Sequence, residues 1–334
     1  MGRQWIVGGP SLAVFQNVSM IRSVKPMSYQ VDRTATCIFV DTSAALRRML
    51  RRLQDSPLVA VDTESDSLYV YFEKVCLLQL SIPDVDYLVD PLRVDIAPLG
   101  VLFASPDHEK VFHAANYDIL CLKRDYGFIF VNIFDTMLAA RILGWKRYGL
   151  AAILQERFGV RVDKRLQRYN WGVRPLPAAA LEYARLDTHY LLPLRELLIR
   201  ELQAYGKLAE AQRAFAREAC AEPVVRGFDA EGFWRIPGVW QLDPVGQAVL
   251  RELYILRDNL AREVDWPPFK VIPNATMIQL AVTRPCTRRD LELVKGLSQH
   301  IRKRFAGKLL DAIARGGCAP VPSPSRTMRP PSPW

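Results

Sequence analysis

The feature that most constrains the fold is a short apolar run that ends in two carboxylates. Residues 58–61 read Leu-Val-Ala-Val, and Asp62, Thr63 and Glu64 follow directly. Consecutive apolar residues bounded by polar ones are typical of a buried strand. Alternate side chains of a strand point to the same face, so Asp62 and Glu64 should project side by side. Two such anions repel each other unless a cation compensates them. A loop rim could also contain this triplet, so the run alone leaves both interpretations open.

Further short apolar runs predict more strands, and helices are interleaved with the later ones. A helix should end at Gly127, another should be capped by Asp135, and Pro193 should kink or divide the last one. Strands that come first and then alternate with helices indicate an α/β domain with a mixed sheet. The predicted strands are residues 58–61, 75–80, 87–89, 110–113 and 129–131. The predicted helices are residues 116–126, 135–143, 150–158 and 178–205.

The C-terminal part has a different pattern. From Val239 to Ile313 apolar residues recur at helical spacing, which predicts four or five short helices and no strand. We therefore expect two domains, with a partly helical linker between them. A tail rich in Pro and Ser should be disordered. The expected parts are an extension of unclear order (1–35), an α/β domain (36–205), a linker (206–236), a helical domain (237–316) and the tail (317–334).

Charge and composition limit the classes of function. The chain has 334 residues, half of them hydrophobic, and a net charge of +10. The basic excess lies in the flanks and in the C-terminal half, whereas residues 36–200 are nearly balanced. This pattern fits an acidic site joined to a module that attracts polyanions, although solubility alone would explain it equally well.

The cysteines and histidines argue against a zinc site or a disulfide framework. The six cysteines form no CxxC pair, and the chain has only four histidines. A metal would therefore have to be held by carboxylates, and a reducing cytoplasm is the expected location. We find no secretory signal and no apolar run that approaches 18 residues, so no membrane partner is expected.

Three further polar residues complete a candidate site. Asp118 falls in the first turn of the predicted helix 116–126, where it would also suit the helix dipole. Tyr183 and Asp187 are four residues apart and share one helix face, as an ordinary surface pair would. Four carboxylates from three segments are costly to gather without a metal ion, and Mg²⁺ prefers oxygen ligands. Two such ions about 4 Å apart can clamp the attacking and leaving oxygens of a phosphodiester, with the phenol of Tyr183 orienting the water.

Three runs carry a resemblance to a known family: VDTESDSLYVYFEKVCLLQLS, VFHAANYDILCL and WGVRPLPAAALEYARLDTHYLL. Over roughly residues 40–205 they resemble the three motifs of the DEDD 3′–5′ exonucleases. The tyrosine four residues before the last aspartate resembles the DEDDy branch, and within it the chain is most similar to ribonuclease D. The resemblance implies a ribonuclease H-like mixed-sheet domain. It also implies that Asp62, Glu64, Asp118 and Asp187 bind two Mg²⁺ or Mn²⁺ ions and that Tyr183 positions the nucleophile.

Residues 239–315 are similar to the HRDC domain, a small all-α module. Its Tyr-x-x-Arg-Asp stretch and Pro-Pro appear as Tyr254, Arg257 and Asp258, and as Pro267 and Pro268. The resemblance implies modest binding of nucleic acid, mainly through phosphates. A solvated basic face is the alternative for any one of the candidate residues. These candidates are Arg284, Arg288, Arg289, Lys295, Arg302, Lys303 and Arg304.

The resemblance implies a 3′–5′ exoribonuclease that releases nucleoside 5′-monophosphates from RNA with a free 3′ end, such as tRNA precursors. A DNA exonuclease on the same scaffold and a non-catalytic nucleic-acid-binding relative are the alternatives. Weaker candidates could contact the substrate strand, and Trp171 could equally be a packing anchor. These candidates are Thr63, Asn116, Lys164, Trp171 and Arg174.

Overall fold

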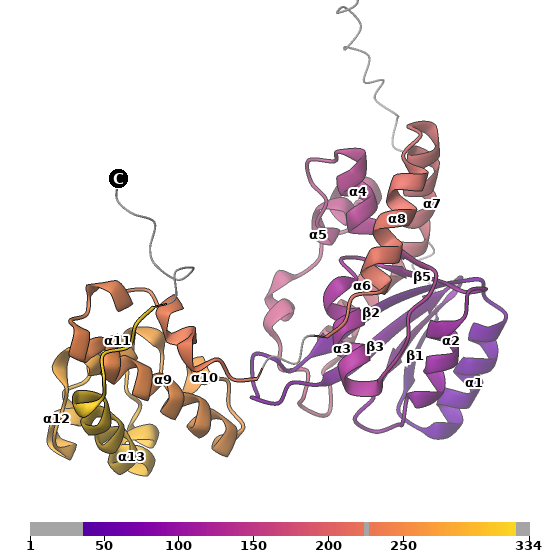
Figure 1. The fold of residues 1–334 in the computed structure, drawn as a ribbon. Helices are drawn as coiled ribbons and strands as arrows, with labels where there is room; N and C mark the ends of the chain where they lie inside the picture. Colours follow the sequence, from indigo (N-terminus) through magenta and orange to yellow (C-terminus); the bar gives the residue numbers. More distant parts are fainter. Residues whose placement is uncertain (1–35, 224–226, 325–334) are drawn as a thin grey trace, which may run out of the picture.

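The computed structural model describes residues 36–223 and 227–324. They form an α/β lobe and an all-helical lobe, which meet over a small contact (Figure 1). The two lobes correspond to the two predicted domains. The predicted extension at residues 1–35 lies outside the described residues, and so do residues 325–334 of the predicted tail.

The α/β lobe is built on one six-stranded sheet with the order β1-β4-β3-β2-β5-β6. β2 is antiparallel to β3 and parallel to β5, so the sheet is mixed, as predicted. The strands are β1 (Thr36–Val40), β2 (Leu58–Ser65), β3 (Val75–Ile82), β4 (Val85–Val89), β5 (Glu109–Phe112) and β6 (Ile133–Asp135).

Both edge strands of the sheet and one helix differ from the prediction. The prediction of a strand at residues 129–131 is wrong, because β6 begins at Ile133. Asn132 has a φ of 55°, a left-handed conformation that interrupts an extended chain, and only the residues after it pair with β5. β1 and helix α1 (Ser43–Gln54) were not predicted at all, although Thr42 caps α1 and apolar residues recur along it.

Helices cover both faces of the sheet. Helix α6 (Ala178–His189) packs on β2, β3 and β4, where Tyr183 and Ala184 join Leu77 and Leu88 in one apolar cluster. The opposite face belongs to the main core, which includes Leu78 and side chains of α1. Leu77 is the register partner of Glu64, so Glu64 lies on the face that α6 covers.

The helical predictions near the site are confirmed. Helix α3 (Asn116–Tyr126) ends at Gly127 with a φ of 67°, and Asp135 caps helix α4 (Thr136–Leu143). The helix expected over 178–205 is divided into α6 and α7 (Leu191–Ala204). The Pro193 ring would clash with the carbonyl of His189, four residues earlier, so the break falls there. The other elements before residue 205 are short: α2 (Gly100–Ala104), α5 (Leu150–Ile153), a π turn (Leu154–Phe158) and 3-10 turns (Ala97–Leu99, Lys164–Arg168).

The connection between the lobes is shorter than the sequence indicated. Helix α8 (Leu208–Ala219) lies in the predicted linker, yet Ala211 and Phe215 are part of the core of the α/β lobe. The 3-10 turn Ala230–Arg235 belongs instead to the helical lobe, because it buries Phe233 in the core of that lobe. The linker proper is therefore close to residues 220–229.

The second lobe is helical throughout the described residues, as predicted. Its last helix runs to Cys318 and so includes two residues assigned to the tail. No helix within 36–223 and 227–324 combines the length and apolar character needed to cross a membrane. After a 3-10 turn (Val239–Gln241), the helices are α9 (Pro244–Val264), α10 (Pro268–Val271), α11 (Asn274–Thr283), α12 (Arg288–Glu292) and α13 (Gln299–Cys318).

Candidate active site

Three of the four predicted carboxylates converge. Asp62 and Glu64 leave β2 on the face that α6 covers, and Asp187 projects from α6. One carboxylate oxygen of each lies within 4.8 Å of the other two. The strand alternation and the helix spacing that suggested the site thus bring these groups to one point, as expected.

Asp118 lies beside this cluster, in the first turn of α3. Its Oδ1 accepts hydrogen bonds from the backbone N–H of Thr63, at 3.1 Å, and from the Thr63 hydroxyl. Thr63 stands between Asp62 and Glu64 on β2, so these bonds anchor Asp118 next to both. The charge of Asp118 raises the pKa of Asp62, Glu64 and Asp187. The charge of Asp118 therefore acts on the other three carboxyl groups, although Asp118 is not among the three residues whose carboxylate oxygens lie within 4.8 Å of one another.

The pKa values of the four carboxyl groups are all raised. Burial is the largest cause for each, and neighbouring carboxylates add to it. The pKa values of Asp118 and Asp187 reach about 7. Ionising such a cluster is costly unless a cation compensates it, and oxygen-only ligands suit a hard divalent cation such as Mg²⁺ or Mn²⁺. The residues present therefore fit a divalent metal site.

Tyr183 lies one helical turn before Asp187 and is 8% exposed. Burial and the charges of Asp187, Glu64 and Asp62 raise its pKa well above the ordinary value. The phenol therefore stays protonated at neutral pH and can both donate and accept a hydrogen bond. Its ring packs against Trp171, with 6.2 Å between ring centroids, which fixes where the hydroxyl lies.

A buried polar network holds α6 on the sheet. Asp86 on β4 accepts hydrogen bonds from Nδ1 of His189, at 2.8 Å, and from the hydroxyl of Ser81, at 2.6 Å. The hydroxyls of Ser81 and Thr188 lie 2.7 Å apart. His189 and Thr188 follow Asp187 on α6, so this network sets the helix position that brings Asp187 to the cluster. Sequence analysis assigned these residues no role.

Three residues that were predicted to contact nucleic acid are engaged by other groups of the protein. The backbone N–H and the hydroxyl of Thr63 are both bonded to Asp118. Trp171 is 1% exposed and packs against Tyr169 and Tyr183, which favours the packing interpretation. The guanidinium of Arg174 binds both carboxylate oxygens of Asp90, at 2.6 and 2.8 Å, and the carbonyl of Trp171. These groups shape the site, and as placed they do not offer a free contact to a strand.

The other two weaker candidates stay predictions. Asn116 is exposed at the start of α3, two residues before Asp118. Lys164 lies in the 3-10 turn Lys164–Arg168, and its side chain is not among those described.

Two further residues, Tyr117 and Gln79, lie near the carboxylate cluster. Tyr117 precedes Asp118 and is 47% exposed, with its hydroxyl 2.9 Å from the Ser65 hydroxyl. The position of Tyr117 next to Asp118 in the sequence was the signal that could have identified it. Gln79 is the register partner of Asp62, fully buried, and neither amide atom has a partner among the described residues. A glutamine inside an otherwise apolar strand was the available signal.

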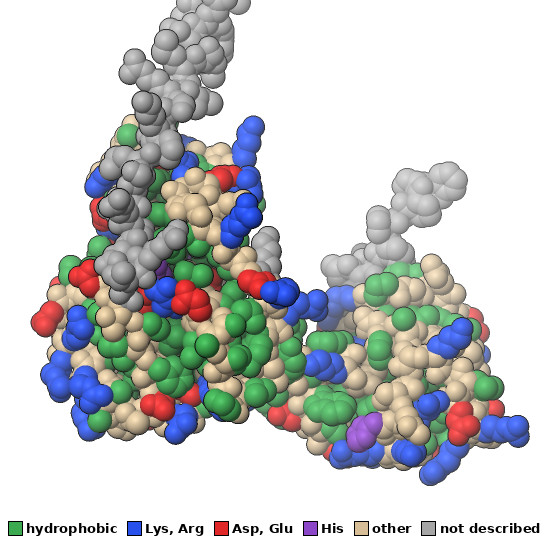
Figure 2. Space-filling model, turned by 180° about the vertical axis from the view of Figure 1, so that it is seen from behind, with side chains coloured by type: hydrophobic (Ala, Val, Ile, Leu, Met, Phe, Trp, Pro, Cys, Tyr) green, Lys and Arg blue, Asp and Glu red, His purple; other side chains and the backbone are tan. Residues whose placement is uncertain are grey.

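The predicted basic residues of the helical lobe partly converge. Arg288, Arg302 and Lys303 line a pocket of about 400 Å³ between α12 and α13, which we call the α12–α13 pocket. Arg289 is exposed on α12. Arg304 instead pairs with Glu263, at 3.5 Å, and so belongs to another part of the surface. Figure 2 shows Lys and Arg side chains spread over the visible face of this lobe.

Removing one carboxylate should stabilise the metal-free protein. The Asp187→Asn variant relieves repulsion within the buried cluster, so its thermal midpoint in EDTA should rise, with each kcal/mol adding roughly 2–4 °C. Excess Mn²⁺ should raise the wild-type midpoint and leave the variant nearly unchanged, because the variant lacks a ligand. Thermal denaturation with and without Mn²⁺ measures both effects. Equal Mn²⁺ shifts for the two proteins would argue against metal binding at the cluster.

Comparison with known proteins agrees with this geometry. A family model described as 3′-5′ exonuclease matches residues 37–203, and the HRDC domain model matches residues 246–313. The exosome complex exonuclease RRP6 of Saccharomyces cerevisiae is 33% identical over 296 residues, which cover 83% of this chain but 40% of that protein. The chain thus spans less than half the length of this curated relative.

Two solved structures show the same fold. The catalytic core of RRP6 from Trypanosoma brucei is 29% identical with a TM-score of 0.79, covering 85% of this chain and 80% of that one. Escherichia coli RNase D is 28% identical with a TM-score of 0.68, covering 85% and 76%. The mixed sheet is therefore the ribonuclease H-like exonuclease core, followed by an HRDC region. The chain belongs to the 3′-5′ exonuclease family and carries a C-terminal HRDC domain.

Proposed function

We propose that this protein is a 3′–5′ exoribonuclease that releases nucleoside 5′-monophosphates from RNA with a free 3′ end. The observation that carries the proposal is the convergence of Asp62, Glu64 and Asp187, with Asp118 coupled to them and Tyr183 one turn away. The proposal is supported by the similarity to E. coli RNase D, whose structure is described as that of an exoribonuclease involved in structured RNA processing. Precursors of tRNA are our proposed substrates.

The four carboxylates would hold two divalent ions, Mg²⁺ or Mn²⁺. When bound, such ions make water more acidic and stabilise the charge of the attacking and leaving oxygens. Tyr183 hydrogen-bonds the water and orients it toward the last phosphodiester, which is the task of a protonated phenol. The water oxygen bonds to phosphorus as the bond to the 3′ oxygen breaks. The water gives up a proton to solvent, the 3′ oxygen of the shortened strand takes one from solvent, and a nucleoside 5′-monophosphate leaves. Burial, together with the charges of Asp187 and Glu64, raises the pKa of Tyr183 and so keeps its hydroxyl in the protonated form that this role requires.

A pair of matched oligomers tests the proposal. RNA and DNA of one sequence, each 5′-labelled and with a free 3′ end, are incubated with the protein and Mg²⁺ or Mn²⁺. The proposal predicts a ladder of RNA shortened from its 3′ end, 5′-monophosphate products, and much slower loss of DNA. Faster loss of DNA would identify a DNA exonuclease, and no loss of either would identify a non-catalytic relative.

We propose that the α12–α13 pocket binds RNA phosphates. Replacing both Arg302 and Lys303 by alanine should weaken RNA binding and flatten its dependence on salt by about 1.4 logarithmic units per decade, because each lost phosphate contact removes about 0.7. Fluorescence anisotropy with single-stranded RNA at several salt concentrations measures this slope. Arg315→Ala is the control, since Arg315 is on the same helix but pairs with Glu252. An unchanged slope in the double variant would place RNA elsewhere.

The cellular location remains a prediction. We propose a cytoplasmic location, as expected from the cysteine pattern of the sequence.

A further inference from the structure

The loop between β2 and β3, residues 66–74, connects the two lobes. We call it the β2–β3 loop. It begins directly after the strand that carries Asp62 and Glu64, and a register irregularity in the β2–β3 pairing marks the junction between Glu64 and Ser65. Four hydrogen bonds join the described residues of the two lobes, and all four involve Tyr71 or Phe72 of this loop.

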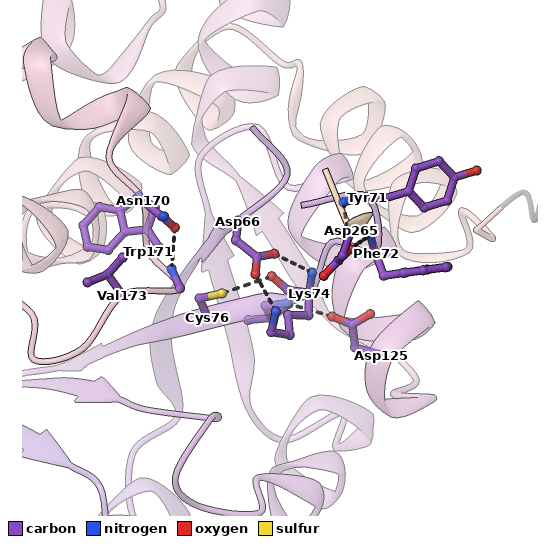
Figure 3. Close-up of polar contacts among 12 residues, drawn as sticks. Asp66, Tyr71, Phe72, Lys74, Cys76, Asp125, Asn170, Trp171, Val173 and Asp265 are labelled. Carbon is purple, nitrogen blue, oxygen red and sulfur yellow. Dashed lines mark hydrogen bonds and ion pairs between the residues drawn. The ribbon is translucent and has the colours of Figure 1, made fainter. Parts of the chain in front are cut away.

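The contacts of Tyr71 with the helical lobe are charge-assisted. Oδ1 of Asp265 accepts the backbone N–H groups of Tyr71, at 3.0 Å, and Phe72, at 3.1 Å (Figure 3). The Tyr71 hydroxyl donates to Asp258, at 2.8 Å, and accepts from Nε of Arg262, also at 2.8 Å. Arg262 also pairs with Asp258, at 3.0 Å, and lies over the Tyr71 ring. Bonds of this kind are stronger than neutral ones, so they hold the loop tip in one position.

The base of the same loop is tied to the helix that carries Asp118. Glu73 accepts hydrogen bonds from the Tyr117 hydroxyl, at 3.1 Å, and from Arg124, both on α3. Val75, just past the loop, donates its backbone N–H to Asp125 of α3, at 2.8 Å. These bonds join the base of the loop to the helix that carries Asp118.

The loop also contacts the segment that leads into α6. The Tyr69 hydroxyl donates to the carbonyl of Arg168, at 2.5 Å. Asp66 binds Lys74 across the loop, and a Cβ added at Gly172 would lie 3.3 Å from Oδ2 of Asp66. Trp171, next to Gly172, packs on Tyr183. The loop thus follows β2 directly, is bonded to α3, and contacts the segment that leads into α6.

We infer that Tyr71 is a positioning residue, through which the helical lobe fixes the β2–β3 loop and with it the geometry of the carboxylate cluster. This inference rests on the proposed function. It goes beyond a role of the HRDC domain in holding RNA, because it predicts an effect on substrates that are too short to need that domain. Tyr71 itself touches neither the carboxylates nor Tyr183.

The test uses the full-length chain and a ribodinucleotide, whose single phosphodiester occupies the carboxylate site. Tyr71→Phe should lower kcat roughly three- to tenfold with little change in KM, because a small misplacement of reacting groups slows the chemical step. It should also raise the Mn²⁺ concentration that gives half-maximal rate. Asp258→Asn should have a similar effect, and the double variant should be no worse than the single ones, since both remove one interaction. Arg315→Ala, which removes a distant ion pair of the same lobe, should behave as wild type.

A wild-type rate on the dinucleotide, with a loss only on long RNA, would overturn the inference and limit Tyr71 to placing the helical lobe. Hydrogen exchange separates this failure from a failure of the proposed function. If the wild-type protein cleaves no RNA, the proposed function fails, but Tyr71→Phe should still speed amide exchange in the loop and at Ser65. Unchanged exchange there would overturn the inference independently. Tyr71→Ala serves as a second variant with a larger expected effect.

Discussion

Replacing Asp118 by asparagine is expected to lower RNA turnover by about 10³-fold or more while the protein remains folded. Asparagine keeps the size of the side chain, and its carbonyl oxygen can still accept the two hydrogen bonds from Thr63. Only the negative charge and one metal-binding oxygen are lost. Single-turnover cleavage of 5′-labelled RNA in Mg²⁺ measures the rate, and circular dichroism measures the fold.

A carboxylate-to-amide change outside the cluster is the matched control. Glu182→Gln lies on α6, where Glu182 is largely exposed and pairs with Arg185. This variant should cleave RNA at close to the wild-type rate. If Asp118→Asn retained turnover in Mg²⁺, the assignment of Asp118 as a metal ligand would be wrong. RNA affinity in EDTA should be similar in all three proteins, because binding does not depend on this charge.

The second large effect is expected for Tyr183→Phe. The ring and its packing on Trp171 are kept, so the loss is that of the hydroxyl that orients water. We expect kcat to fall about 10- to 100-fold with little change in RNA affinity. This is at or below the lower end of the range for a general acid or base, because the hydroxyl only orients the water. Steady-state kinetics on RNA, together with anisotropy, separates the two effects.

Tyr169→Phe is the control for this variant, because Tyr169 also packs on Trp171, with 5.3 Å between ring centroids. It should leave turnover nearly unchanged. If Tyr183→Phe weakened binding as much as turnover, Tyr183 would have a packing role and the water-orienting role would be rejected.

Much of the site could be predicted because local geometry determines it. Strand alternation puts Asp62 and Glu64 on one face, and helical spacing puts Tyr183 and Asp187 on one face. Neither rule says that these faces meet. The two faces meet because α6 packs on β2, and the buried hydrogen bonds of Asp86 help to fix that packing. The sequence around Asp86 or His189 does not indicate that these two distant residues form a pair.

Where the structure differs from the expectations, a tertiary contact or a local backbone conformation accounts for the difference. Arg174 was expected to contact a strand, but Asp90, 84 positions earlier, engages its guanidinium. Helix α8 was assigned to a partly helical linker, yet its Ala211 and Phe215 are part of the core of the α/β lobe. The strand at residues 129–131 failed because Asn132 adopts a left-handed conformation, which apolar patterning does not reveal.

Tyr71 shows the same limit for function. Its partners Asp258 and Asp265 lie nearly 200 positions later in the chain, so no pattern around the tyrosine indicates them. The structure places it between the lobes, where it links the helical domain to the loop beside the carboxylates.

The central claim is that the four carboxylates hold two divalent ions. Anomalous diffraction from crystals soaked in Mn²⁺ tests it most directly. We expect two strong peaks about 4 Å apart, contacted by oxygens of Asp62, Glu64, Asp118 and Asp187. A map with no peak at this cluster, in crystals whose Asp62, Glu64 and Asp187 are well ordered, would contradict the metal site and the proposed nuclease mechanism with it.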